Sequence, residues 1–115
     1  MKQKLIDILE QFCEGHVYLQ GTMNPDEAYP ADFVTFWTAD TEDGEHFDNV
    51  VAAIHWTFQV MYYSNNPVDV NTKPQAIAAA LKAAGFVQSG RGNDLLSDEP
   101  THTGWAMTFT ITENL

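Results

Sequence analysis

Histidines and a single cysteine are the residues of this sequence best suited to chemistry. His46 lies in an acidic stretch with Glu45 and Asp48, and His102 follows two further acids, Asp98 and Glu99. Imidazole and carboxylate groups together can bind a divalent metal. Neither cluster has the fixed ligand spacing of a metal site, however. We therefore expect no metal, and we interpret the acidic stretch as a solvated hairpin tip.

The remaining reactive residues do not form a catalytic pattern either. Cys13 has Glu10 and Glu14 as neighbours, and their negative charge disfavours a thiolate, so we expect a buried apolar cysteine. The sequence GRGND at 90–94 lacks the strand-to-helix context and the lysine of a phosphate-binding loop. No Ser/His/Asp arrangement is recognisable. The sequence predicts a protein that is not an enzyme and has no cofactor.

The first half of the chain is predicted to form one helix and two strands before an acidic turn. Leu5, Ile8, Leu9 and Phe12 recur on one face of a helix over about residues 2–13. Short apolar and aromatic runs indicate strands at 17–19 and 33–38, separated by an irregular loop at 21–32. The stretch 40–48 then reads as a hairpin loop with Gly44 at its tip.

The second half begins with the longest predicted strand, 50–63, in which Ile54, Trp56, Phe58, Val60 and Tyr62 alternate with a mixed face of His55, Thr57, Gln59, Met61 and Tyr63. A helix should start at an N-cap Thr72, with Pro74 in its first turn and Gln75 closing a capping box, and end at Gly85. A short strand at 86–87, turn-rich loops at 90–94 and 97–104, and a strand at 105–112 follow. This order predicts a single α+β domain, 1–115, with a mostly antiparallel sheet of four to five strands and two helices on one face.

Composition and charge exclude several classes of function. The chain of 115 residues is 44% hydrophobic, enough for one core, and no apolar run is long enough to cross a bilayer. Its net charge is −11, and no Lys or Arg lies between Lys4 and Lys73. Nucleic acids and anionic lipid surfaces would repel such a chain. The N-terminus lacks the apolar stretch of a secretion signal, and the lone cysteine indicates a reducing compartment.

Five segments resemble small structural proteins of tailed phages and prophages of Gram-positive bacteria, encoded among the head–tail joining and tail-completion genes. They are YPADFVTFW (29–37), HFDNV (46–50), WTFQVMYYSNNP (56–67), ALKAAGF (80–86) and SGRGNDLLSDEPTHTGW (89–105). The element order also resembles that of the tail terminators, α/β subunits that form a ring, commonly hexameric, on the tail tube. The resemblance implies a non-enzymatic protein of the virion tail or neck, present in the host cytoplasm during assembly. It implies no catalytic residue.

This reading predicts contacts with copies of the chain and with other tail or neck proteins, without nucleic-acid or membrane binding. The residues expected to make contacts are the mixed strand face, His55, Thr57, Gln59, Met61 and Tyr63, and the loop residues Asp98, Glu99 and His102. The acidic loop residues Asp40, Glu42, Asp43 and Glu45 would suit the wall of a channel through which DNA passes. Three alternatives remain open at this point: an acidic DNA mimic that inhibits a DNA-binding protein, a neighbouring head-completion or minor capsid protein, and a metal-dependent hydrolase built on His46 and His102.

Overall fold

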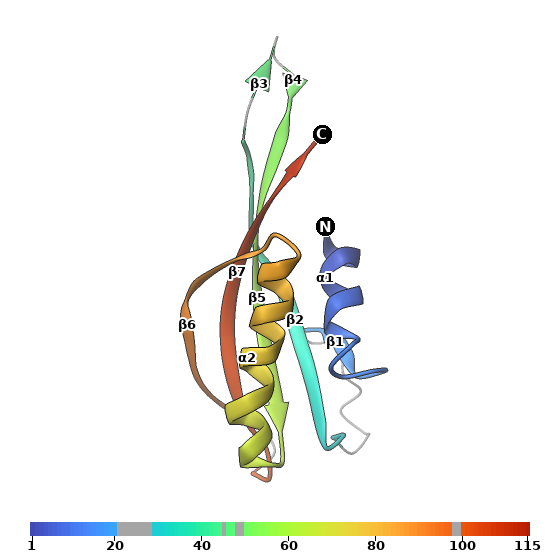
Figure 1. Cartoon of the computed structure of the whole chain (residues 1–115), viewed down its shortest axis with the longest axis vertical. Helices are drawn as coiled ribbons and strands as arrows, with labels where there is room; N and C mark the ends of the chain where they lie inside the picture. The colour runs from blue at the N-terminus through green and yellow to red at the C-terminus, as the bar shows by residue number, and fades with distance from the viewer. Residues whose placement is uncertain (21–28, 45, 48–49, 98–99) are drawn as a thin grey trace.

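A five-stranded sheet carries both helices on one of its faces (Figure 1). The computed structural model describes residues 1–20, 29–44, 46–47, 50–97 and 100–115. In chain order the elements are α1 (Lys2–Leu9), β1 (Val17–Leu19), β2 (Asp32–Asp43), β3 (His46–Phe47), β4 (Val50–Val51), β5 (Ala53–Ser64), α2 (Pro67–Ala83), β6 (Val87–Leu96) and β7 (Thr103–Asn114). The strand order is β1-β2-β5-β7-β6, and only β1–β2 is parallel. The α+β prediction is confirmed.

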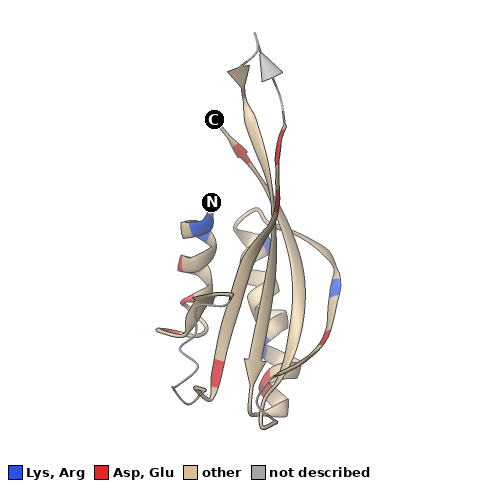
Figure 2. Ribbon diagram, turned by 180° about the vertical axis from the view of Figure 1, so that it is seen from behind, with Lys and Arg blue, Asp and Glu red and all other residues tan. Residues whose placement is uncertain are grey.

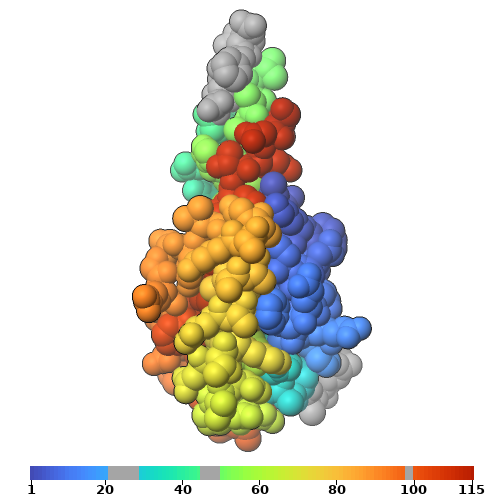
Figure 3. Space-filling model, in the orientation of Figure 1, coloured from blue at the N-terminus to red at the C-terminus, as the bar shows by residue number. Residues whose placement is uncertain are grey.

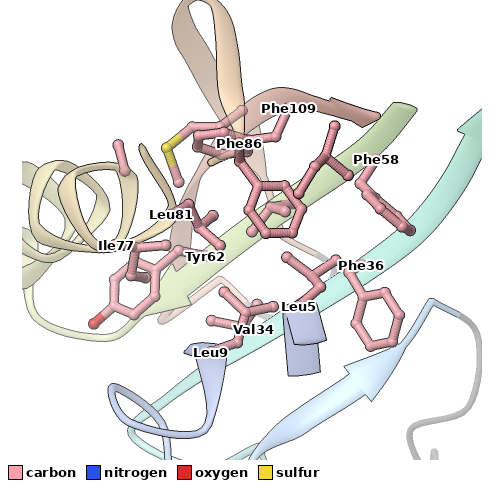
Figure 4. Packing of buried hydrophobic residues seen from close by; sticks show 14 of the residues in the cluster. Leu5, Leu9, Val34, Phe36, Phe58, Tyr62, Ile77, Leu81, Phe86 and Phe109 are labelled. Carbon is pink, nitrogen blue, oxygen red and sulfur yellow. The ribbon is translucent and has the colours of Figure 1, made fainter. Parts of the chain in front are cut away.

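The core lies between the helices and the sheet. Leu5 and Leu9 of α1 and Ile77 and Leu81 of α2 are fully buried against the apolar side of the strands (Figure 4). That side is formed by the alternate residues Val34, Phe36, Phe58, Val60, Tyr62, Met107, Phe109 and Ile111. Full burial of one such side chain stabilises the fold by roughly 1.5–3 kcal/mol. The predicted alternation of the two long strands is therefore confirmed.

The predicted hairpin is present, but residues 40–43 belong to its strands and not to its loop, while Glu45 and Asp48 lie outside the described residues. β2 continues to Asp43, which pairs with Ile54, and the Gly44 amide still donates to the Ala53 carbonyl, 2.8 Å away. The β3–β4 pair then extends the hairpin further. Pairing with the long apolar β5 overrides the local turn signal because each residue added to the ladder gains a backbone hydrogen bond. We call the described residues between 40 and 57 the acidic arm; its outer part projects from one end of a molecule that measures 54 × 28 × 22 Å (Figure 3).

The second helix starts six residues earlier than predicted, because its N-cap is Asn66. The prediction that Thr72 is the N-cap is therefore wrong. The Asn66 side chain accepts from the Val68 amide at 3.0 Å, and Pro67 takes the first helical position. Thr72 lies inside the helix and donates its hydroxyl proton to the Val68 carbonyl at 3.0 Å. The sequence contains two successive cap-and-proline signals, and the first is the one used.

Three other boundaries differ from the prediction. The regular part of α1 ends at Leu9, and the chain continues in turns to Cys13, whose amide donates to the Leu9 carbonyl. The segment 90–94, predicted as a loop, belongs to β6, which pairs with β7 on both sides of a bulge between Ser89 and Asn93. β7 includes Thr103 and Gly104 of the other predicted loop, and Asp98 and Glu99 lie outside the described residues.

Candidate functional site

The face of the sheet turned away from both helices is the first candidate site, and we call it the open face (Figure 2). Cross-strand partners in a sheet point to the same side, so the register places His55, Thr57, Gln59, Met61 and Tyr63 here, as predicted. His55 is exposed, and Thr57, Gln59 and Tyr63 are half-buried. Met61 is only 6% exposed, between Thr35 and Ala106 on the neighbouring strands. The open face is thus neither an apolar core nor a fully hydrated surface.

The centre of the open face is tied together by polar contacts between β5 and β7. His55 Nδ1 lies 2.8 Å from Thr112 Oγ1, and Gln59 Nε2 donates to Thr108 Oγ1 at 2.9 Å. These cross-strand pairs satisfy the polar groups within the chain. A partner would therefore meet an ordered, threonine-rich surface.

An aromatic cluster lies at the end of the open face where β2 begins and β5 ends. The ring of Tyr63 stacks on Phe33 with centroids 5.0 Å apart, and Tyr29 contacts both Phe33 and His102. His102 is buried, and its Nε2 lies 2.8 Å from the Pro30 carbonyl, which can only accept; Nε2 therefore carries the proton. His102 acts as an internal link between two segments and does not present its ring to a partner.

Two large apolar side chains remain exposed on either side of the open face. Trp37 on β2 is 40% exposed and pairs with Gln59, and Val87 on β6 is 65% exposed and pairs with Thr110. Trp37 and Val87 are separated by β5 and β7, so they are two single exposed apolar side chains rather than one contiguous apolar patch.

The acidic arm is the second candidate site. Asp40 and Glu42 are exposed and pair with Thr57 and His55, so both lie on the open face, whereas Asp43 pairs with Ile54 and lies on the opposite face. Glu45, the fourth acidic residue predicted here, lies outside the described residues. The backbone of His46 belongs to β3. Within the described part of the chain, no three potential metal ligands come together.

A polar cluster behind the sheet was not predicted. Lys73 Nζ of α2 contacts Asp32 Oδ2 at the start of β2 and also donates to the Phe12 carbonyl at 3.3 Å. Tyr62 donates its hydroxyl proton to the same Asp32 oxygen at 2.9 Å. The cluster joins α2, β2, β5 and the turns after α1, and Cys13 lies against it. No sequence spacing reveals it, because Asp32 and Lys73 are 41 residues apart.

For Asp32 and for Lys73, burial and hydrogen bonding shift the pKa of the side chain in opposite directions. Burial raises the pKa of Asp32, but the hydrogen bonds from Lys73 and Tyr62 outweigh it and hold that pKa below its ordinary value. Burial lowers the pKa of Lys73, and the Asp32 contact more than reverses this. For Cys13, burial and the Asp32 charge raise the pKa to about 12, so the thiol stays protonated, as the sequence predicts. We therefore interpret the cluster as a structural clasp without a nucleophile.

No protein-family model and no curated protein matches this chain.

The positions of the helical acids bear on the alternative that this protein is a DNA mimic. Of the helical acids that a DNA mimic would use, Asp7 is exposed on α1, Glu10 caps its C-terminus and accepts from the Gly15 amide at 2.8 Å, and Glu14 follows the helix. The described helices thus carry no extended row of carboxylates. Neither of them is long and apolar enough to cross a membrane.

Proposed function

We propose that this chain is a non-enzymatic structural protein of a tailed phage, a tail-terminator or tail-completion component that assembles with its own copies at the head–tail junction. The proposal includes a ring of subunits in contact with other tail or neck proteins, within the virion. The segments quoted above carry the resemblance to that family, and the order of helices and strands agrees with it.

The observation that carries the proposal is the open face. Both helices lie on one side of the sheet, and the other side has an ordered polar centre flanked by exposed Trp37 and Val87. Burying these two side chains between subunits would release apolar surface from water, at roughly 25 cal/mol per Å². A ring needs two different lateral surfaces on each subunit, and the flanks of this face lie on different strands, β2 and β6.

The acidic arm supports the same proposal in a second way. Its carboxylates would repel DNA that passes through the ring, although screening limits that repulsion to about 8 Å at physiological salt. Only those carboxylates of the arm that lie at the channel wall, outside the contacts between subunits, can therefore act on DNA.

A phage carrying the neutralised arm, with Asp40→Asn, Glu42→Gln, Asp43→Asn and Glu45→Gln, tests the proposal. We expect a folded protein with an unchanged circular-dichroism spectrum and a reduced yield of infectious particles, with failed head–tail joining or DNA ejection visible by electron microscopy. The matched control is Asp7→Asn with Glu14→Gln, which removes exposed acids away from the arm. Normal infectivity of the arm variant, together with absence of the protein from purified particles, would reject the proposal.

The position of the protein in the particle separates the terminator from its nearest alternative. Immunogold labelling at the tail end of isolated tails supports a tail terminator. Labelling of tail-free heads would instead identify a head-completion protein.

A further inference from the structure

A groove between α2 and β6 is not used by the fold or by either surface described above. It has a volume of about 510 Å³, and its floor is formed by apolar side chains, Pro74, Ala78, Trp105 and Met107. This size falls within the range of about 300–1,000 Å³ that is usual for ligand pockets. It opens on the helix side of the molecule, between the yellow helix and the orange strand of Figure 3.

The groove exists because β6 bows away from β7 (Figure 1). The register between the two strands shifts between Ser89 and Asn93, and Gly90 and Gly92 in this bulge have left-handed φ angles of 71° and 103°. A Cβ on Gly92 would overlap the Ala106 carbonyl and the Trp105 indole. The indole N–H donates to the Arg91 carbonyl at 3.0 Å, which fixes the backbone of the residue between the two glycines. The glycine-flanked Arg91 is therefore held at the lip of the groove.

The charge of the groove is opposite to that of the protein. The chain has 16 acidic and 5 basic residues, yet two basic residues, Lys82 and Arg91, line the groove, and among the described residues no acidic one does. Both are exposed, and neither forms an ion pair with a described residue. Lys73, by contrast, is bound to Asp32. The groove thus offers two available cations above an apolar floor, which suits an acidic segment of a protein.

The acidic arm has the complementary features. Asp40 and Glu42 are exposed on the same face, two residues apart on one strand, and therefore about 7 Å apart along it. No Lys or Arg lies between Lys4 and Lys73, so neither strand of the β2–β5 hairpin contains a Lys or Arg of its own. Asp40 and Glu42 lie on the open face of their own subunit, whereas the groove opens on the helix side of the sheet. A contact between the arm and this groove therefore requires a second copy.

We propose that the groove between α2 and β6 receives the acidic arm of a neighbouring copy of this chain, with Asp40 and Glu42 facing Lys82 and Arg91. The inference rests on the proposed self-assembly and adds how one subunit recognises the next. The arm and the groove are different surfaces, so the contact is head-to-tail and can close into a ring. Asp43 lies on the opposite side of the arm and takes no part in this contact.

Reciprocal charge reversal of the full chain tests this contact. In the groove variant, Lys82→Glu and Arg91→Glu, an acidic arm meets an acidic groove. In the arm variant, Asp40→Lys and Glu42→Lys, a basic arm meets a basic groove. We expect each variant alone to associate at least about tenfold more weakly than the unaltered protein, as measured by sedimentation velocity. An equimolar mixture of the two should regain association, because every arm then finds an oppositely charged groove.

Matched controls separate this effect from net charge and misfolding. Lys2→Glu with Lys4→Glu changes the charge by the same amount on α1 and should leave association unchanged. Thermal unfolding should be similar for all variants, because both reversed pairs are exposed. Variants that each associate like the unaltered protein would overturn the arm–groove contact while leaving the proposed function intact. A groove variant that no longer attaches to tails but still self-associates would also overturn the arm–groove contact, since another protein would then occupy the groove. The proposed function would again stay intact.

Cross-linking reports the contact even if association is weak. In a Cys13→Ala background, a chain with Glu42→Cys is mixed with a chain with Arg91→Cys and oxidised. A disulfide-linked dimer of the two chains supports the contact, with Lys2→Cys in place of Arg91→Cys as the negative control. Failure to form this dimer faster than the control overturns the inference. Whether the protein occurs in the particle is decided separately, by the electron-microscopy experiment above.

Discussion

The Nζ atom of Lys73 contacts the carboxylate of Asp32, joining the first half of α2 to the start of β2. Lys73 also reaches the Phe12 carbonyl beyond α1, and Asp32 also accepts from Tyr62. This ion pair and its hydrogen bonds thus connect α2 and the turns after α1 to both strands of the β2–β5 hairpin. Loss of this ion pair should lower the free energy of unfolding of the whole domain.

Replacing Lys73 by Met should destabilise the protein by about 1–3 kcal/mol. Met keeps the apolar stem but leaves the Asp32 carboxylate and the Phe12 carbonyl without their cation. The free energy of unfolding in urea measures the effect. Lys82→Met, at an exposed position on the same helix, is the control and should change stability by no more than about 0.5 kcal/mol. Equal effects of the two substitutions would contradict the role of the clasp.

The same ion pair predicts a particular acid sensitivity. Because the pKa of Asp32 is lower in the folded protein than its ordinary value of 3.8, the unfolded chain binds more protons between these two values. The stabilisation is complete above the ordinary pKa and is lost as pH falls through the folded one. Asp32→Asn should therefore be less stable than the unaltered protein at pH 7, and the difference should shrink below about pH 4. Urea unfolding across this range measures it; a difference independent of pH would count against the shift.

Gly104 allows the Tyr63 ring to lie across it. A Cβ at Gly104 would be 2.7 Å from the ring of Tyr63 and 2.9 Å from the Tyr62 carbonyl oxygen. Gly104→Ala should push the ring off its stack on Phe33 and destabilise the protein by about 1–3 kcal/mol. If the ring is the obstacle, combining Gly104→Ala with Tyr63→Ala should cost less than the sum of the two changes. Additive unfolding free energies would show that the backbone contact dominates.

Cys13 should be unreactive in the folded protein. Its side chain is 3% exposed, so a reagent has little access to the sulfur. Its pKa is raised to about 12, so very little of the reactive thiolate is present. A chromogenic disulfide reagent at pH 8 should therefore react slowly with the native protein and rapidly after unfolding in urea. Rapid reaction of the native protein would mean that the turns after α1 open readily.

The sequence by itself determined the elements whose signal repeats along the chain. Apolar residues alternate along both long strands: Trp56, Phe58, Val60 and Tyr62 in one, and Trp105, Met107 and Phe109 in the other. Because successive side chains of a strand point to opposite faces, this alternation determined which face of each strand is buried. The apolar stripe from Leu5 to Leu9 did the same for α1. These patterns were sufficient for the α+β class and for the residues of the open face.

The tertiary structure decided where local signals competed or where partners are distant in the chain. Asn66–Pro67 and Thr72 are both acceptable helix starts, and the earlier one is used with Val70 packed against the core. The acidic residues 40–43 and the glycine-rich 90–94 favour turns locally, yet long neighbouring strands supply hydrogen-bond partners and draw both into the sheet. The Lys73–Asp32 clasp and the cationic groove depend on contacts between distant segments. Such contacts leave no spacing in the sequence, because only the folded chain brings their residues together.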